Sequence, residues 1–207
     1  MVKNNENFGA GVEKLRTAMI LYLVGLAVIV IGGILAIVGG VSHLPGIIYW
    51  PVLIIGFAIF LLSFFLERKG FAIISSANES YSIGSVGALL QLIGSAIFLA
   101  GIVLIAVINL LTIGAAVHSL QQPNGASAGY VALTGTGTMS AIILLVAIFI
   151  GGAIIFIGSI LAIVGFWRIG ASNNSDMIQV GAILYLVVNI IGAILLMIGL
   201  DPSNIKK

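Results

Sequence analysis

The chain has 207 residues, of which 61% are hydrophobic and only 7% are charged, whereas soluble domains have roughly 45–50% apolar and about 25% charged residues. This composition excludes an ordinary soluble domain, and the net charge of +2 is too small to indicate a nucleic-acid partner. Because the chain has no cysteine, disulfides, thiolate metal sites and cysteine nucleophiles are excluded as well.

Three long stretches contain no Lys, Arg, Asp or Glu: residues 17–66, 80–167 and 177–200. A helix needs about 20 mostly apolar residues to cross a bilayer, and these stretches hold five such lengths. The sequence therefore predicts an all-α integral membrane protein, a bundle of about five transmembrane helices that forms a single membrane domain over residues 1–207. The expected spans are 17–41, 47–66, 86–110, 139–166 and 178–200.

The distribution of Lys and Arg predicts the orientation, because these residues are enriched on the cytoplasmic side of membrane proteins. A cytoplasmic N-terminus places six of them inside, namely Lys3, Lys14, Arg16, Arg68, Lys69 and Arg168. Five spans then place the C-terminus outside together with Lys206 and Lys207. These two lysines conflict with an odd number of spans, and an even number would remove the conflict.

Small residues recur every seven positions in the apolar stretches. Residues 25–39 and 151–165 are identical at eleven of fifteen positions. Seven residues of an α-helix come within about 20° of two full turns, so such residues share one face. Small residues on one face allow close approach of helices in lipid, where packing and hydrogen bonds drive association. The expected glycine packing seams are Gly25/Gly32/Gly39, Gly56/Ser63, Gly87/Gly94/Gly101, Gly151/Gly158/Gly165 and Gly192/Gly199.

A longer repeat suggests a duplicated hairpin. Arg68-Lys69-Gly70 precedes a polar loop and then Val-Gly-Ala-Leu-Leu at 86–90, while Arg168-Ile169-Gly170 precedes a polar loop and then Val-Gly-Ala-Ile-Leu at 180–184. Residues 47–110 and 139–200 are therefore interpreted as two copies of one unit. Parallel repeats of this kind occur in transporters and are equally compatible with a simple scaffold.

Ionisable residues inside a span would indicate function, and the sequence places none clearly within one. Arg16, Glu67, Arg68, Arg168 and Asp201 fall at the expected helix ends, where they are interpreted as interface anchors. Among uncharged polar residues, Asn189 lies near the middle of the last span, and an interhelical hydrogen bond is the first interpretation of its amide. Lining a polar pathway is the alternative. Gln91 and Asn109 lie toward the ends of the third span, within reach of headgroups or water.

Catalytic, cofactor-binding and metal-binding residues are not expected. The two histidines, His43 and His118, fall in outer turns without a carboxylate or cysteine beside them, which makes a poor metal site. No serine has a histidine and a carboxylate arranged to activate it. The sequence therefore predicts no enzyme activity, no cofactor and no metal.

Several motifs resemble one known family. They are Leu15-Arg16-Thr17, Tyr81-Ser82-Ile83-Gly84, Phe166-Trp167-Arg168-Ile169-Gly170 with Asn173-Asn174, and Ile191-Gly192-Ala193-Ile194-Leu195. Over nearly the whole chain the sequence resembles the archaeal multi-pass membrane proteins grouped as domain of unknown function 973. The resemblance implies an archaeal plasma membrane and no particular substrate, cofactor or catalytic residue.

Two functional hypotheses follow. The first is a non-enzymatic packing, scaffold or interaction protein that resides in the lipid bilayer and associates with copies of itself or with a membrane-protein partner. The alternative is a small transporter or channel for a neutral or lipid-like solute, with the two repeated hairpins as its halves. A polar, water-accessible interior would favour the transporter, and a closely packed apolar interior would favour the scaffold.

Overall fold

A computed structural model describes residues 2–42, 49–120 and 126–204, with side chains at 7–38, 49–112 and 139–204. These residues are almost entirely helical and contain no strand. The elements are α1 (Val2–Ser42), α2 (Tyr49–Ser75), the short 3-10 helix η1 (Glu79–Tyr81), α3 (Ser82–Leu120), α4 (Ala126–Ser172), α5 (Asp176–Val187) and α6 (Asn189–Gly199).

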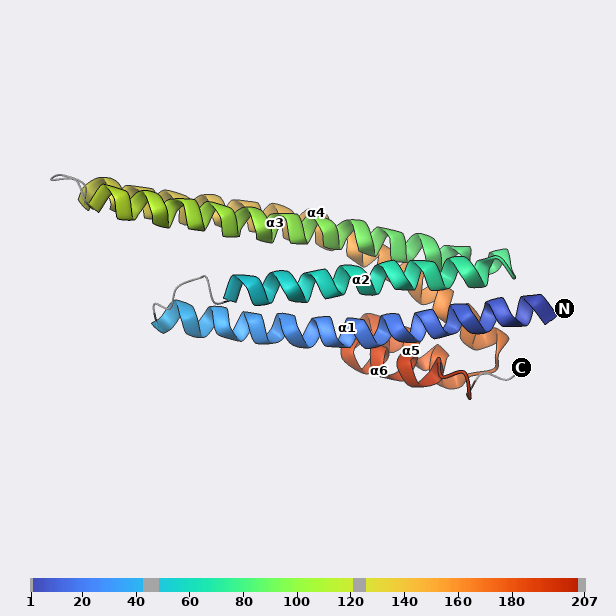
Figure 1. Cartoon of the computed structure of the whole chain (residues 1–207). Coiled ribbons are helices and arrows are strands. Elements are labelled where there is room, and N and C mark those ends of the chain that lie inside the picture. The colour runs from blue at the N-terminus through green and yellow to red at the C-terminus, as the bar shows by residue number, and fades with distance from the viewer. Residues whose placement is uncertain (1, 43–48, 121–125, 205–207) are drawn as a thin grey trace.

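Four helices, α1 to α4, are each long and apolar enough to cross a membrane. Figure 1 shows them as two antiparallel pairs, α1 with α2 and α3 with α4, which meet where α2 contacts α3. Many large apolar side chains remain exposed on this surface, among them Val30 on α1, Val107 on α3 and Phe149 on α4. Such side chains suit lipid better than water. The expected all-α character is confirmed for the described residues, and four of the helices are suited to span a membrane by length and composition.

Residues 178–200 do not form the single helix that was expected as the fifth span. The helix breaks at Val188, whose φ is −130° and ψ is 74°. α6 then runs back along α5, because Gly192 abuts the backbone of Tyr185 and Gly199 abuts Ile178. With 12 and 11 residues, the two helices are each about 16–18 Å long. Neither crosses a hydrocarbon core of about 30 Å, so this segment is a short helical hairpin.

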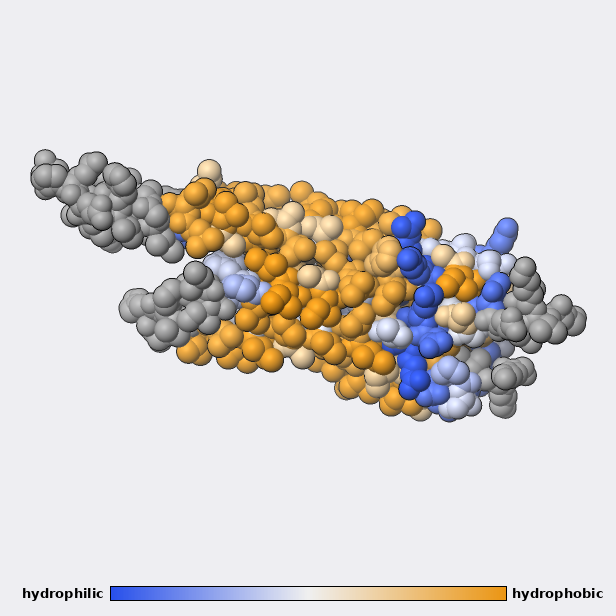
Figure 2. All heavy atoms as spheres, viewed as in Figure 1, coloured by the Kyte–Doolittle hydropathy of each residue, from blue (hydrophilic) through white to orange (hydrophobic). Residues whose placement is uncertain are grey.

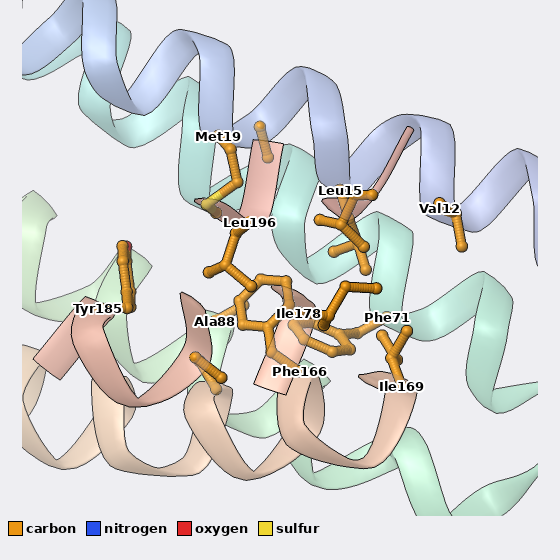
Figure 3. Packing of buried hydrophobic residues seen from close by; sticks show 14 of the residues in the cluster. Val12, Leu15, Met19, Phe71, Ala88, Phe166, Ile169, Ile178, Tyr185 and Leu196 are labelled. Carbon is orange, nitrogen blue, oxygen red and sulfur yellow. The ribbon is translucent and has the colours of Figure 1, made fainter. Parts of the chain in front are cut away.

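The hairpin closes a ring of helices at one end of the bundle. Around this ring α1 contacts α2, then α3, α4, α5 and α6 follow in order, and α6 returns to contact α1. The interior holds a cluster of buried side chains contributed by all six helices (Figure 3). Its labelled members include Leu15, Met19, Phe71, Ala88, Phe166, Ile178, Tyr185 and Leu196. Toward the opposite end the two antiparallel pairs diverge (Figure 1).

All the charged side chains that the structure describes lie at the ringed end, where Figure 2 shows a hydrophilic band. Both ends of the described chain lie there too (Figure 1). Arg16 at the start of the apolar part of α1 forms an ion pair of 2.8 Å with Asp201, just after α6. The last segment thus folds back toward the end of the bundle where it begins, and the side of the membrane on which each terminus lies stays a prediction.

Asp201 holds this end of the chain through several contacts. Its Oδ1 accepts hydrogen bonds from the backbone N–H of Ser203 at 3.0 Å and from the Ser203 hydroxyl at 2.7 Å. These hydrogen bonds, together with the Arg16 guanidinium, hold the pKa of Asp201 below its usual range. A lowered pKa in the folded state means that this stabilisation is present at neutral pH and is lost as the pH falls through that pKa.

Candidate functional site

The glycines of the expected packing seams lie where helices meet. On Gly158 of α4, an added Cβ would lie 2.7 Å from the backbone nitrogen of Gln91 and 2.7 Å from the carbonyl oxygen of Gly87, both on α3. On Gly32 of α1 it would lie 2.9 Å from the side chain of Leu53 on α2. Similar close contacts to another helix occur at Gly25, Gly56, Gly87, Gly94, Gly101, Gly151, Gly165, Gly192 and Gly199. Gly39 lies outside the described side chains.

Neighbouring glycines provide a contrast. Gly33 and Gly152 directly follow seam positions, yet an added Cβ at either would meet nothing within 4 Å. The close contacts are thus a property of one helix face and not of glycine content in general. We predict that the close contacts at the seam glycines stabilise the bundle. Substitutions at Gly33 and Gly152, where an added Cβ meets nothing within 4 Å, provide the controls for this prediction.

Asn189 lies at the turn of the hairpin and not in the middle of a continuous helix. Its Oδ1 accepts a hydrogen bond from the Tyr22 hydroxyl of α1. The Tyr22 ring also packs on Tyr185 of α5, with ring centroids 5.3 Å apart, and on Phe60 of α2 at 4.5 Å. A single such hydrogen bond in a membrane protein is worth roughly 0.6–2 kcal/mol. The tip of the hairpin therefore contacts α1 through the Tyr22–Asn189 hydrogen bond, which lies beside the packed rings of Tyr22, Phe60 and Tyr185.

Glu67 differs most from its sequence-based interpretation as an interface anchor. Its side chain is 0% exposed, whereas the adjacent Arg68 and Lys69 are exposed. Neither carboxylate oxygen has a hydrogen-bond partner among the described residues. Helix geometry explains the burial: Ser63 and Gly70 on the same face contact α1, through a 3.0 Å hydrogen bond to the Ala18 carbonyl and through close packing on Leu15. The spacing from Ser63 to Gly70 was the signal that sequence reasoning missed.

A second polar contact joins α3 and α4. Gln91 was expected to reach headgroups or water, but its side chain is 0% exposed. Its Nε2 donates to the Ser159 hydroxyl at 2.9 Å, and the Ser159 hydroxyl donates to the Ile155 carbonyl at 2.9 Å. Asn109 instead donates to the Ile105 carbonyl of its own helix at 2.8 Å. Gln91 thus forms a hydrogen bond between α3 and α4, whereas Asn109 forms one within α3.

The expected absence of a metal site rests partly on residues that are not described, since His43 and the side chain of His118 lie outside the described part. Within the residues whose side chains the structure describes, no three His, Cys, Asp or Glu side chains are grouped to hold a metal ion. The polar side chains that the fold brings together are instead Tyr22 and Asn189 near Glu67, and Gln91 with Ser159 between α3 and α4.

Comparison with known proteins identifies one family. The family model described as "Protein of unknown function (DUF973)" matches residues 10–207, which confirms the resemblance seen in the sequence. An archaeal origin remains an expectation. No match was found among curated proteins or among solved structures.

Proposed function

The chain belongs to the family of proteins described as DUF973, and on this premise we propose that it is a non-enzymatic multi-pass membrane protein that packs against copies of itself or a protein partner through the α5–α6 hairpin. The observation that carries this proposal is the exposed break in the backbone at Val188, between α5 and α6. Four crossings and one hairpin that enters and leaves from the same side would also place the C-terminus on the cytoplasmic side of the plasma membrane.

The break lies at membrane depth under this arrangement. The tip is level with Tyr22, whose hydroxyl bonds to Asn189, and Tyr22 is about 9 Å further along α1 than Arg16. Yet Val187 is 73% exposed and Ile190 is 50% exposed. Val188 itself keeps its backbone hydrogen bonds, since its N–H donates to the Leu184 carbonyl at 2.7 Å and its carbonyl accepts from the Gly192 N–H at 3.0 Å. The helical hydrogen-bond pattern is nevertheless interrupted between α5 and α6, and interrupted backbone at this depth is tolerated only where protein or a water-filled cavity covers it. One chain alone leaves the tip uncovered.

The chemistry of the tip favours protein over water as the cover. Its exposed side chains are Val187, Val188, Asn189, Ile190 and Ile191, and all of them except Asn189 are apolar. Its one polar side chain, Asn189, already accepts the hydrogen bond from Tyr22. An apolar surface gains little from water, but a second protein surface would pack on the valine and isoleucine side chains and shield the broken backbone.

A transporter for a neutral or lipid-like solute remains the second candidate. Half-length helices that fold back at membrane depth are typical of transporters, where they line the substrate path. The hairpin and the buried Glu67 are the observations that favour it. In that case the tip would face water, and a cysteine placed at the tip would react quickly with a hydrophilic reagent.

Cross-linking at the tip tests the proposal. Single cysteines replacing Val187, Ile190 or Ile191 in this cysteine-free chain are expected to form oxidative dimers from at least one position in vesicles, while reacting slowly with a hydrophilic maleimide. Val30→Cys, exposed on α1 away from the tip, is the cross-linking control, and Ser76→Cys at the charged end is the labelling reference. A partner-bound form would show slow labelling and a cross-link to another protein. Labelling as fast as at Ser76→Cys would refute the proposal and favour the transporter.

Topology provides a separate prediction. With the N-terminus cytoplasmic, the four-crossing arrangement puts all eight Lys and Arg residues on the inner side, which resolves the conflict raised by Lys206 and Lys207. Single cysteines at positions 78, 127 and 204 are then expected to react with an impermeant reagent on intact cells only at 127. Labelling at 78 but not at 127 would reverse the orientation, and labelling at 204 with 127 would mean that residues 178–200 cross the membrane.

A further inference from the structure

Glu67 occupies the inside of the ringed end of the bundle. It lies one helical turn from both Ser63 and Gly70, on the face of α2 that contacts α1. α1 residues near this level include Leu15 and Ala18, both fully buried. The carboxylate is within electrostatic range of Tyr22 on α1 and Tyr185 on α5. It is therefore enclosed by three helices although Arg68 and Lys69 beside it reach the surface.

No described charge compensates this carboxylate. Arg16 of α1 pairs with Asp201, and no described ion pair joins Lys14 or Arg16 of α1 to Glu67. Lys69 lies over the Phe65 ring, 4.4 Å from its centroid, and Arg168 of α4 donates to the Ser80 carbonyl. The described side chains of α3 include no ionisable group, and Glu79 of η1 is exposed. A carboxylate buried without a counter-charge or hydrogen bond is very costly, and proteins accommodate such a group by binding a proton or a cation to it.

The side chains around Glu67 favour a proton over a metal cation as the group that binds its carboxylate. A metal ion needs about four or more ligating atoms, whereas neither oxygen of Glu67 has a hydrogen-bond partner among the described residues, and the Ser63 hydroxyl one turn away donates to the Ala18 carbonyl. The Tyr22 hydroxyl already donates to Asn189. The remaining neighbours are members of the buried apolar cluster, such as Phe64 and Phe71. A proton needs only the carboxyl oxygen itself, so it fits this environment where a metal ion does not.

We propose that Glu67 is a proton-binding site inside the bundle, which holds one proton on its carboxyl group in the folded protein and exchanges it with water at the charged end. The α1 residues that contact Ser63 and Gly70, Ala18 and Leu15, lie on either side of Arg16 in the chain, and the Arg16–Asp201 ion pair is partly exposed, so water is near this level of the bundle. The site goes beyond the proposed packing function, because it gives the ringed end a chemical group that can take up and release a proton. It does not depend on whether the hairpin tip contacts a partner.

Infrared spectroscopy of the full chain in lipid tests this proposal directly. A protonated carboxyl group has a C=O stretching band distinct from that of a carboxylate, and the band shifts in D₂O. At neutral pH the wild-type protein is expected to show one such band, which is lost reversibly as the pH is raised. Glu67→Gln, which keeps the shape and stays neutral, should lack the band and fold normally. Glu13→Gln, at an exposed position on α1, should retain it.

A chemical probe provides a second readout. Dicyclohexylcarbodiimide is an apolar reagent whose C=N bond adds a protonated carboxyl group, and the product rearranges to an N-acylurea that carries the whole reagent. Mass spectrometry is expected to find this adduct on Glu67 and not on the exposed Glu13, Glu79 or Asp176. A wild-type spectrum without the protonated band, or a band that persists in Glu67→Gln, would overturn the proposal. So would an adduct spread evenly over all carboxylates.

Discussion

Gly192→Ala is expected to open the α5–α6 hairpin, because an added Cβ at this position would collide with the backbone nitrogen and Cα of Tyr185. Backbone atoms cannot rotate away as a side chain can, so the two helices would have to separate. Overpacking a tight site costs typically about 1–3 kcal/mol and occasionally more, and we expect a loss at or above the upper end of that range. Separation would also break the Tyr22–Asn189 hydrogen bond.

Two measurements report on this change. Thermal unfolding in mild detergent should show a large drop in stability, and a cysteine at position 204 should become accessible to an impermeant reagent on intact cells if residues 178–200 straighten into a further crossing. Gly152→Ala is the matched control, since its Cβ would meet nothing within 4 Å, and it should leave both readouts unchanged. Equal stabilities of the two variants would mean that the hairpin is not held by the close approach at Gly192.

Gly158→Leu should separate α3 from α4. The new side chain would enter the space now filled by the backbone of Gln91 and Gly87, each 2.7 Å from the Cβ position. The nearby Gln91–Ser159 hydrogen bond of 2.9 Å would be disturbed as well. We expect a loss of roughly 3 kcal/mol or more from overpacking. Gly32→Leu should cost less, because its nearest neighbour is the side chain of Leu53, which can move.

The control for the α3–α4 contact lies one position from a seam glycine. Gly152→Leu adds the same side chain to the same helix, but on a face where a Cβ meets nothing within 4 Å. Its melting temperature in detergent should remain close to that of the wild type. If Gly158→Leu and Gly152→Leu were equally stable, the seven-residue spacing of glycines would reflect composition alone.

The membrane character of the fold was predictable because it depends on composition and on segment length, which are local properties. Four of the five expected spans correspond to long apolar helices at nearly the expected positions. The helix faces were predictable as well, since a seven-residue spacing in an α-helix puts residues on one face regardless of the partner. Gly25, Gly94 and Gly151 accordingly lie against another helix.

The break at Val188 could not be predicted in the same way. Neither proline nor glycine occupies positions 187–189, and a continuous apolar run of this length reads as a crossing helix. The hairpin depends on partners distant in sequence, above all Tyr22, which lies 167 residues from Asn189. The same break brings the chain after α6 back to the end of the bundle where α5 begins, as the contact of Gly199 with Ile178 shows.

The sequence by itself therefore determined that this protein consists of long apolar helices suited to a membrane, and which of its glycines share a helix face. These properties follow from hydropathy and helical periodicity, which need no knowledge of contacts. Only the tertiary structure decided that the last apolar run folds back, that Asn189 bonds to Tyr22, and that Glu67 is enclosed while Arg68 reaches the surface. Those outcomes depend on which helix faces meet, and that is set by packing among segments far apart in the chain.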